Sequence, residues 1–415
     1  MFYNKHGDIM ERQILHVDVN NAFLSWTAID RLRAGETLDI RTIPAIIGGD
    51  ESSRHGVVLA KSMKAKEFGI KTGEPIYQAR KKCPNVQVFQ GDYASYQKHS
   101  NELYGLLLEY TDQIERFSID ECFLDMTLFL PPKETLLNKA YEINRRVREE
   151  LGFTVNVGVA NNKLLAKMAS DFKKPDRVHT LWKEEIPTKM WVLPISDLFM
   201  VGRKSIPKLA GMGIKTIEDL AKQEETILIK RFGKHGKMMW EYANGIDHSE
   251  VVYQLEQPKC IGNSITLPQD IYNLNRLNEI LLALAEQVAF RLRKHKLKAS
   301  VVSVQIKTKD FVNFSHQKTL SSPTNLTKDI YETSKELLAN LHQNRAVRLI
   351  GIQTSKLVEK DQEQLSIFEE QTNPKQEKIE EVMEGIKKKY GYGMITRAGE
   401  MKVKDMLNIR EEKHE

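Results

Sequence analysis

Two adjacent carboxylates, Asp120 and Glu121, lie between two short apolar runs, a pattern that predicts two strands joined by a tight turn. A third acid, Asp18, lies in another apolar strand, Ile14 to Val19. Carboxylates on buried strands require a cation to offset their charge. Three such groups, with the carbonyl oxygen of Val19, can hold two divalent metal ions that clamp the oxygens of a phosphoryl transfer. For the Asp-Glu pair alone a solvated acidic turn is the simpler interpretation, but the rest of the chain favours the metal site.

Two lysines and one aromatic residue accompany these acids. Lys66 and Lys174 can meet a triphosphate, although either alone can equally be a solvated surface lysine. No Gly-x-x-x-x-Gly-Lys-Ser/Thr loop is present, which argues against a P-loop enzyme. Phe23 lies in the first turn of a helix expected from Asn21 to Arg33, where its ring can exclude a ribose 2′-hydroxyl or simply fill a core.

A glycine-containing hairpin is expected between Met200 and Leu220. Ser205 is expected to cap a first short helix, and the spacing of Thr216 and Asp219 predicts a capping box at a second. Such a hairpin can present backbone N–H groups to a phosphate, or it can be a packing unit only. Its candidate DNA contacts are Gly202, Arg203, Lys204 and Gly213.

Length and charge set the broad class. The chain has 415 residues and a formal net charge of +6, so several domains are expected, and the charge alone does not identify a nucleic-acid partner. Cys83, Cys122 and Cys260 form neither a metal motif nor a disulfide framework, which favours a reducing compartment. No apolar run is long enough to span a bilayer, and residues 1–12 lack the core of a signal peptide. We therefore expect a soluble cytoplasmic protein with no membrane partner.

The elements that must position these residues follow from periodicity. An amphipathic helix is expected from Lys133 to Leu151, a strand from Val155 to Ala160 and a helix from Lys163 to Phe172. Residues 260–355 predict the order strand, helix, strand, strand, helix, strand. Two helices would cover one face of that sheet, and basic residues crowd the same region.

The chain becomes rich in Gln and Glu after Lys356, which predicts a linker, with one more helix from Glu377 to Tyr390. Within the linker lies the short apolar peptide Gln364-Leu365-Ser366-Ile367-Phe368. Apolar residues between such polar flanks favour a docking peptide over a strand or helix that packs back on the body.

Together these segments resemble the Y-family, or translesion, DNA polymerases from about Ile14 to Glu370. The most specific matches are His16-Val17-Asp18-Val19-Asn20 and Ser118-Ile119-Asp120-Glu121. Val157 to Lys163 and Ala166 to Asp171 match next, in the same order and spacing. This set is very improbable by chance.

The resemblance implies an α+β multidomain fold of the right-hand type, with a ferredoxin-like palm, small fingers, a helix-hairpin-helix thumb and a four-stranded βαββαβ little finger. The boundaries that it implies are as follows: 1–24 for the N-terminal tail and first palm segment, 25–91 for the fingers, 92–181 for the palm, 182–250 for the thumb, 257–356 for the little finger, and 357–415 for the linker and tail.

The activity implied is low-fidelity, template-directed addition of dNTPs to a primer past lesions, by a monomer associated with the nucleoid and without proofreading. Asp18, Val19, Asp120 and Glu121 would hold two Mg²⁺ ions, or Mn²⁺. Phe23 would be the steric gate, and Lys174 and Lys66 would approach the triphosphate. The Gly202 hairpin would contact primer-template DNA. The residues that would bind a sliding clamp are Gln364, Leu365, Ile367 and Phe368.

This chain departs from the family pattern in four places. Ala22 stands where many members carry a second aromatic residue before the gate. Met63-Lys64-Ala65-Lys66 replaces the usual Tyr-x-Ala-Arg, so Lys66 lacks the arginine fork. Met200 replaces the first glycine of the usual thumb hairpin. The longer tail suggests a subgroup nearer to the catalytic subunit of DNA polymerase V.

Two other functions fit part of the sequence. The first is a non-catalytic DNA- and clamp-binding scaffold that competes with other polymerases, which the retention of all three carboxylates opposes. The second is another palm-domain enzyme such as a nucleotide cyclase, which the hairpin and the basic C-terminal domain oppose.

Overall fold

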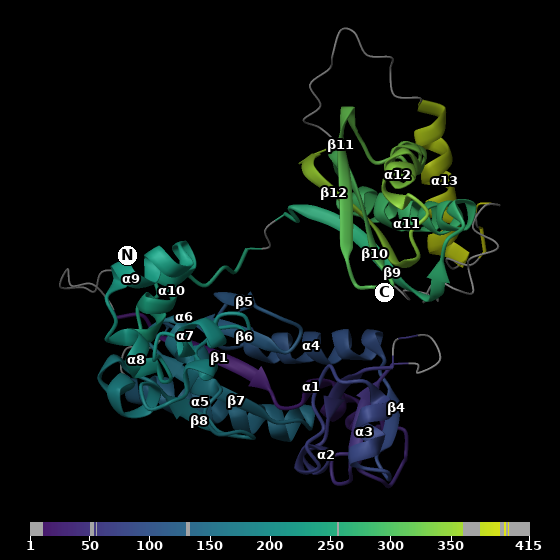
Figure 1. The fold of residues 1–415 in the computed structure, drawn as a ribbon. Helices are drawn as coiled ribbons and strands as arrows, with labels where there is room; N and C mark the ends of the chain where they lie inside the picture. Colours follow the sequence, from purple (N-terminus) through teal and green to yellow (C-terminus); the bar gives the residue numbers. More distant parts are fainter. Residues whose placement is uncertain are drawn as a thin grey trace. The chain divides into compact units, whose positions relative to one another are not determined.

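The computed structural model describes residues 11–49, 54, 56–129, 133–254, 257–359, 374–390, 394–395 and 397 (Figure 1). Contacts divide the chain into two compact units. The first unit comprises Met1–Gly48 and Val58–Leu255, and the second comprises Gly49–Val57 and Glu256–Glu415. No helix in the described part of the chain is long and apolar enough to cross a membrane.

The first unit is built around a five-stranded sheet in the order β5-β6-β1-β7-β8. The central strand β1 (Ile14–Val19) is antiparallel to β6 (Glu121–Asp125) and to β7 (Val155–Ala160). The edge strands are β5 (Ile114–Arg116) and β8 (Val178–Thr180). The β5–β6 hairpin confirms the strand-turn-strand predicted around the acidic pair.

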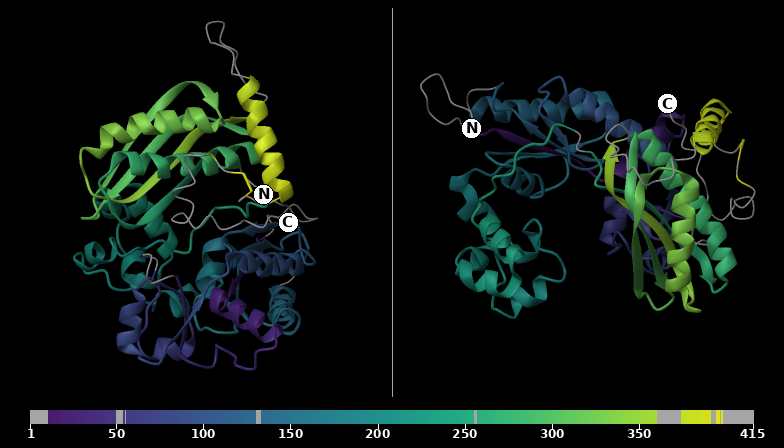
Figure 2. Two further views of the ribbon diagram at one scale, coloured as in Figure 1. Left: turned by 90° about the vertical axis from the view of Figure 1, so that its right-hand side faces the viewer. Right: turned by 90° about the horizontal axis from the view of Figure 1, so that it is seen from above.

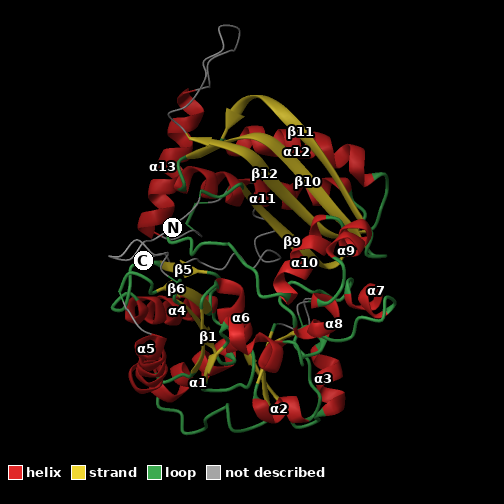
Figure 3. Cartoon of the chain, turned by 90° about the vertical axis from the view of Figure 1, so that its left-hand side faces the viewer, coloured by secondary structure: helices red, strands yellow, loops and turns green. Residues whose placement is uncertain are grey.

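Both faces of this sheet are covered, which is why every residue of β1 and β7 is buried. Leu15, Val17 and Val19 pack in one core with residues of α1 (Ala22–Arg33), α4 (Tyr93–Leu107) and α5 (Lys133–Arg146). A π-helical turn, Val147–Leu151, extends α5 to the predicted end. Because side chains alternate along a strand, Ile14, His16 and Asp18 face the other side of the sheet, where α6 (Lys163–Ser170) lies (Figure 3).

Gly158 explains how closely α6 approaches the sheet. A Cβ atom at this β7 position would lie 1.8 Å from the carbonyl oxygen of Ala166 and 2.7 Å from the backbone nitrogen of Ser170. Only a glycine therefore lets α6 rest directly on the strand.

A smaller three-stranded sheet in the order β3-β2-β4 completes the N-terminal part of the first unit. Strand β2 (Ala45–Gly48) pairs antiparallel with β3 (Val58–Lys61) and parallel with β4 (Gln87–Gln90). Helices α2 (Met63–Glu67) and α3 (Ile76–Lys82) belong to the same region, and Ala65, Ile76 and Ala79 share a core with Ile46 and Val58 of the strands.

The remainder of the first unit is helical. Short helical turns at Lys183–Glu185, Ile186–Met190 and Ile195–Asp197 lead to α7 (Ile206–Ala210) and α8 (Ile217–Ala221). Helices α9 (Glu225–Phe232) and α10 (Lys234–Ala243) follow. The predicted capping box is confirmed: the Asp219 backbone N–H donates to Thr216 Oγ1 at 3.1 Å, and the Thr216 N–H donates to Asp219 Oδ2 at 2.9 Å.

The predicted cap at Ser205 is wrong. Its backbone is already helical, with φ −84° and ψ −38°, and its side chain makes no capping hydrogen bond. A capping residue needs an extended backbone to turn its hydroxyl toward the first free N–H groups. The backbone N–H groups of Ser205 and Ile206 instead donate to the Gly202 carbonyl oxygen, at 2.9 Å and 3.3 Å.

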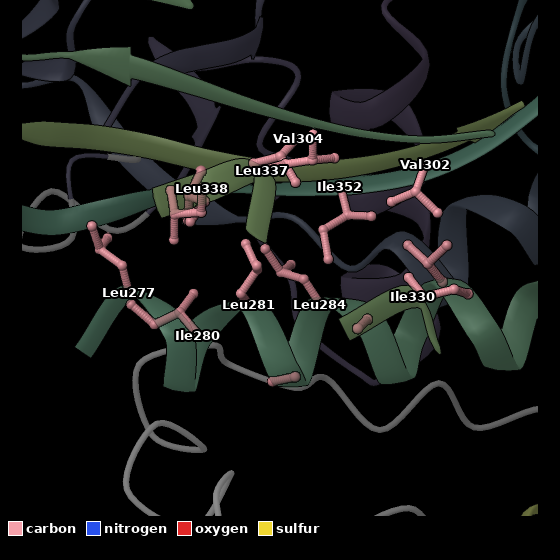
Figure 4. Close-up of a cluster of buried hydrophobic side chains, with 14 of the residues drawn as sticks. Leu277, Ile280, Leu281, Leu284, Val302, Val304, Ile330, Leu337, Leu338 and Ile352 are labelled. Atoms are coloured by element: carbon pink, nitrogen blue, oxygen red, sulfur yellow. The ribbon is translucent and has the colours of Figure 1, made fainter. Parts of the chain in front are cut away.

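The second unit confirms the predicted strand-helix order. It runs β9 (Cys260–Ile271), α11 (Leu274–Lys294), β10 (Leu297–Thr308), β11 (Asn313–Thr324), α12 (Thr327–His342) and β12 (Val347–Glu359). The four strands form an antiparallel sheet in the order β11-β10-β12-β9. Both helices lie on one side of it (Figure 2). Leu277, Leu281 and Leu284 of α11 meet Val302, Val304 and Ile352 of the strands in its core (Figure 4).

A further helix, α13 (Pro374–Tyr390), confirms and extends the helix predicted from Glu377. Ion pairs hold it on the second unit. Glu380 is only 2% exposed and pairs with Arg293 of α11 at 3.4 Å and with Arg397 at 2.5 Å. Lys387 forms an ion pair with Glu286 of α11.

Candidate active site

Strand register brings the predicted acids to one end of the five-stranded sheet. Asp18 of β1 lies directly opposite Glu121 of β6. Asp120 occupies the turn before β6, and its carbonyl oxygen accepts a hydrogen bond from the Val19 N–H at 3.0 Å. Asp18 and Glu121 therefore lie across one strand pair, with Asp120 and Val19 beside them.

Two lysines on or near α6 meet these acids. Lys167 Nζ donates to Glu121 Oε1 at 2.8 Å, and Phe117 and Phe199 flank its ammonium group, with ring centroids at 5.6 Å and 5.4 Å. Lys174 forms an ion pair with Asp18 and lies 2.9 Å from Asp171 Oδ1. The pairing of Lys174 with Asp18 agrees with its predicted place beside the acids. The role of Lys167 escaped the sequence reasoning, and its position one helical turn after Lys163 was the available signal.

Burial makes the charged form of Asp18 costly despite its lysine partner. Burial raises the pKa of Asp18 to about 6, although the charge and hydrogen bond of Lys174 act in the opposite direction. Burial also disfavours the charged form of Lys174, but Asp18 and Asp171 outweigh it and raise the pKa of Lys174 to about 12. Ionisation of Asp18 therefore remains unfavourable even beside the ammonium group of Lys174. Further positive charge nearby would stabilise the ionised carboxylate.

The three carboxylates do not converge on one point. Within the described ranges, no group of three or more His, Cys, Asp and Glu side chains is close enough to hold a metal ion. Asp18 and Glu121 each pair with a lysine, and Asp120 accepts a hydrogen bond from Ser118 Oγ at 2.7 Å. The donor chemistry nevertheless fits magnesium, because all of these ligands are hard oxygens.

Two buried asparagines fix the segment that carries Lys174. Asn20 Oδ1 accepts hydrogen bonds from the Asp176 N–H at 2.8 Å and from Thr154 Oγ1 at 3.0 Å. Asn156 Nδ2 donates to the carbonyl oxygens of Ser170 at 2.9 Å and Lys173 at 3.1 Å. The two amides are joined by a 3.2 Å hydrogen bond. This network explains why the chain after α6 returns to the end of β1.

His16 lies beneath the same helix as a neutral ring. Burial, with the nearby charges of Lys167, Lys174 and Lys163, lowers its pKa well below the usual value. Its Nδ1 lies 2.8 Å from Ser170 Oγ, and its ring centroid lies 4.4 Å from that of Phe123. It therefore packs α6 against the sheet and adds no charge to the site.

Phe23 lies on α1 and is partly buried. Its ring stacks on that of Tyr96, with centroids 4.7 Å apart and an interplanar angle of 14°. Tyr96 Oη lies 2.8 Å from Thr27 Oγ1, which also donates to the Phe23 carbonyl oxygen at 2.7 Å. Tyr96 was missed in the sequence reasoning. Its signal is the aromatic pair Tyr93 and Tyr96, in the first turn after the Asp92 cap.

Lys66 is exposed on α2, in the region of the smaller sheet. Burial, together with the charge of Lys66, lowers the pKa of Lys61 on β3. Lys61 lies on the smaller sheet and Lys66 on the helix that follows it, whereas the three carboxylates lie at one end of the five-stranded sheet.

The predicted hairpin contacts are exposed together. Gly202, Arg203 and Lys204 precede α7, and Gly213 lies in the turn between α7 and α8 with φ +80°. Met200 also has a left-handed backbone, with φ +68°. The apolar peptide with Gln364, Leu365, Ile367 and Phe368 lies outside the described residues.

Known proteins match this chain over nearly its whole length. The model of the impB/mucB/samB family matches residues 17–171, and that of the impB/mucB/samB family C-terminal domain matches residues 258–367. The DNA polymerase IV of Clostridium acetobutylicum is 46% identical over 389 residues, which cover 94% of this chain and 98% of that protein. DNA polymerase IV 1 of Bacillus subtilis is 34% identical over 397 residues, or 94% of each chain.

A solved structure shares the fold. The Y-family DNA polymerase chimera Dbh-Dpo4(243-245)-Dbh superposes with a TM-score of 0.74 at 22% identity, covering 84% of this chain and 99% of that one. The predicted right-hand fold, with its separate four-stranded C-terminal sheet, is thereby confirmed. The expectation of a subgroup nearer to polymerase V is not supported, because the Clostridium and Bacillus relatives are both polymerase IV proteins and match nearly all of this chain.

Proposed function

The chain belongs to the impB/mucB/samB family and is a translesion DNA polymerase of the Y family, of the polymerase IV type; from this premise we propose that Asp18, Asp120 and Glu121 are its catalytic carboxylates. As a DNA polymerase it acts on DNA and deoxynucleoside triphosphates. We assign to these acids and the carbonyl oxygen of Val19 two Mg²⁺ ions, for which Mn²⁺ can substitute. Carboxylate and carbonyl oxygens are the ligands that such hard cations prefer.

The observation that carries this proposal is the position of Asp18 directly opposite Glu121, together with the burial of Asp18, which is 6% exposed and whose pKa burial raises. Lys174 and Lys167 supply positive charge to Asp18 and Glu121. Two bound ions would supply charge neutralisation for the triphosphate and for the attacking primer oxygen.

The lysines have different roles in this scheme. Lys174 is the more exposed, at 37% of its side chain against 9% for Lys167. Once Asp18 is a metal ligand, Lys174 is the ammonium group that can turn to a phosphate oxygen of the incoming nucleotide. Lys167 keeps its hydrogen bond to Glu121 and orients that carboxylate. We also assign triphosphate binding to Lys66, which the exposed position of its side chain on α2 permits.

We assign Phe23 the role of steric gate against a ribose 2′-hydroxyl. Its stack on Tyr96 supports this role, because a ring that excludes one hydroxyl must be held in place.

We assign residues 1–24 to the N-terminal tail and first palm segment, 25–91 to the fingers, 92–181 to the palm, 182–250 to the thumb, 257–356 to the little finger and 357–415 to the linker and tail. The two sheets of the first unit, helices α7 to α10 and three of the four strands of the second unit lie within these ranges, which supports the assignment. Helix α1 crosses the limit at residue 24, and β12 runs past the limit at 356 to Glu359.

Two contacts complete the proposal. The exposed residues Gly202, Arg203, Lys204 and Gly213 would touch the DNA backbone through N–H groups and positive charge, which position DNA without reading its sequence. The peptide from Gln364 to Phe368 would bind the sliding clamp by its apolar side chains.

Primer extension tests the active site. Wild type and the double variant Asp120→Ala/Glu121→Ala are compared with primed DNA, dNTPs and Mg²⁺, and DNA binding by both is measured in parallel. We expect extension by the wild type only, with equal binding. The matched control is Asp112→Ala/Glu109→Ala, which removes two acids near the same sheet and should extend normally.

If neither wild type nor variant extends the primer while both bind it, the scaffold function replaces the polymerase. Equal extension by both would instead place the chemistry at other residues.

A further inference from the structure

One end of the sheet of the second unit exposes aromatic side chains in a group. The pairs Thr308 with Val347 and Val347 with Ile271 bring the ends of β10 and β9 to either side of the start of β12. Tyr272 follows Ile271 and is 58% exposed, and Phe311 and Val312 in the β10–β11 turn are 64% and 50% exposed. Large apolar side chains at a solvent-facing sheet end indicate a contact surface.

The backbone holds Phe311 in an unfavourable conformation. Its φ is +62°, a region that bulky residues rarely occupy. The turn that holds it is closed by hydrogen bonds from Phe311 N–H to the Thr308 carbonyl at 2.9 Å and from Thr308 N–H to the Val312 carbonyl at 3.0 Å. The Lys309 N–H donates to the Ala346 carbonyl at 3.1 Å and ties this turn to the α12–β12 connection. Strain of this kind persists where surrounding contacts enforce it and is concentrated at functional sites.

A register irregularity in β12 places the side chain of Arg348 over the ring of Phe311. The pairing of β12 with β9 shifts between Val347 and Leu349, and that with β10 shifts at Thr308. Arg348 lies at this bulge, and its guanidinium group lies 4.8 Å from the centroid of the Phe311 ring. Bulges of this kind redirect a side chain at sheet edges and binding sites.

The surroundings of the aromatic group are basic. The guanidinium group of Arg345 lies 4.2 Å from the centroid of the Phe314 ring. Lys307 and Lys309 lie in or beside the turn, which contains one acidic residue, Asp310. Aromatic faces set among cations form the combination that binds single-stranded nucleic acid, in which bases stack and phosphates meet positive charge.

We propose that Phe311 and Tyr272 form a stacking platform for the bases of single-stranded DNA, with Arg348, Arg345 and Lys309 meeting its phosphates. The proposal rests on the proposed function, since a polymerase that copies a template must handle its unpaired bases. Tyr272 follows the end of β9 and Phe311 follows the end of β10, and these two strands are separated in the sheet only by β12. The positive charge of the surrounding arginines and lysines favours a polyanion such as DNA over a protein partner.

Fluorescence anisotropy with a labelled oligothymidine tests the platform in the full chain. We expect Phe311→Gly and Tyr272→Ala each to weaken binding by about tenfold, the usual effect of losing one stacked base. Glycine suits the left-handed backbone, so Phe311→Gly should fold as well as the wild type. The matched control is Tyr141→Ala, which removes an equally exposed tyrosine, at 54%, from α5 of the first unit and should bind normally.

Two further arms identify the interaction. Phe311→Trp should restore binding, because indole stacks at least as well as phenyl. An abasic strand of the same length should bind wild type and variants alike, because it offers phosphates without bases.

Equal losses on the abasic strand would overturn stacking in favour of phosphate contact. Unchanged binding by both variants would overturn the platform. These outcomes do not depend on primer extension, so failure of the polymerase assay would leave them standing.

Discussion

At the scale of single residues, Asp18 is costly to keep ionised. Burial raises its pKa to about 6, above that of an aspartate in an unfolded chain. A group whose pKa is raised on folding stabilises the fold at low pH, and that contribution is lost as the pH rises through about 6. Asp18→Asn keeps the size and removes the titration. We therefore expect the free energy of unfolding in EDTA to rise by on the order of 1–3 kcal/mol near pH 8.

Thermal unfolding at several pH values checks this prediction. The advantage of Asp18→Asn should shrink as the pH falls from about 6 to about 4, because below that range aspartate is protonated in both the folded and the unfolded state. Added Mg²⁺ should stabilise the wild type more than the variant. A variant less stable than the wild type near pH 8 without metal would mean that the ion pair with Lys174 outweighs burial.

Tyr96 gives a second prediction at this scale. Tyr96→Leu removes the ring on which Phe23 stacks, a contact worth about 0.5–1.5 kcal/mol, so we expect discrimination against ribonucleotides to fall by up to roughly tenfold. Tyr96→Phe keeps the ring, loses only the contact with Thr27 and should discriminate almost as well as the wild type. The measurement is the ratio of dNTP to rNTP incorporation, which loss of folded protein leaves unchanged. An unaltered ratio in Tyr96→Leu would show that Phe23 needs no such support.

At the scale of elements, the position of α6 depends on Gly158. A Cβ there meets the backbone of α6 at 1.8 Å, and backbone cannot rotate away as a side chain can. We expect Gly158→Ala to destabilise the first unit by about 3 kcal/mol or more and to reduce extension, because α6 must shift and carry Lys167 away from Glu121. The control is Gly105→Ala on α4, which meets nothing within 4 Å and should stabilise by about 0.5–1 kcal/mol. Normal stability and activity in Gly158→Ala would contradict the packing argument.

The elements also show what periodicity can and cannot reveal. The β5–β6 hairpin and the strand-helix order of the second unit were predictable, because apolar residues recur there with the period of the structure. The charged contact face of α13, with Glu380 and Lys387, was not, because a pattern search expects the buried face to be apolar. The pairing of Lys167 with Glu121 could not be predicted from periodicity either. Glu121 reaches this site through its register with Asp18, and these two residues are about a hundred positions apart in the sequence. Acid positions were therefore readable from the sequence, and their cationic partners required the fold.

At the scale of the whole molecule, the two units have separate cores. The apolar cluster of the second unit contains only its own residues, and the ion pairs of Arg293, Glu380 and Lys387 also close within it. The acids, lysines and gate of the active site all belong to the first unit. Units with separate cores are expected to unfold separately.

Calorimetry of the full chain should then show two transitions that respond to different variants. Arg293→Met keeps the aliphatic length but leaves the nearly buried Glu380 with one cation fewer, a change that costs about 2–4 kcal/mol. We expect it to lower only the transition of the second unit, by roughly 5–15 °C, while Gly158→Ala lowers only that of the first. Extension by Arg293→Met should persist below its own transition, because no proposed catalytic residue lies in the second unit. A single transition that both variants lower together would mean that the two cores unfold as one cooperative body, and each substitution would then reach the active site through the stability of the whole chain.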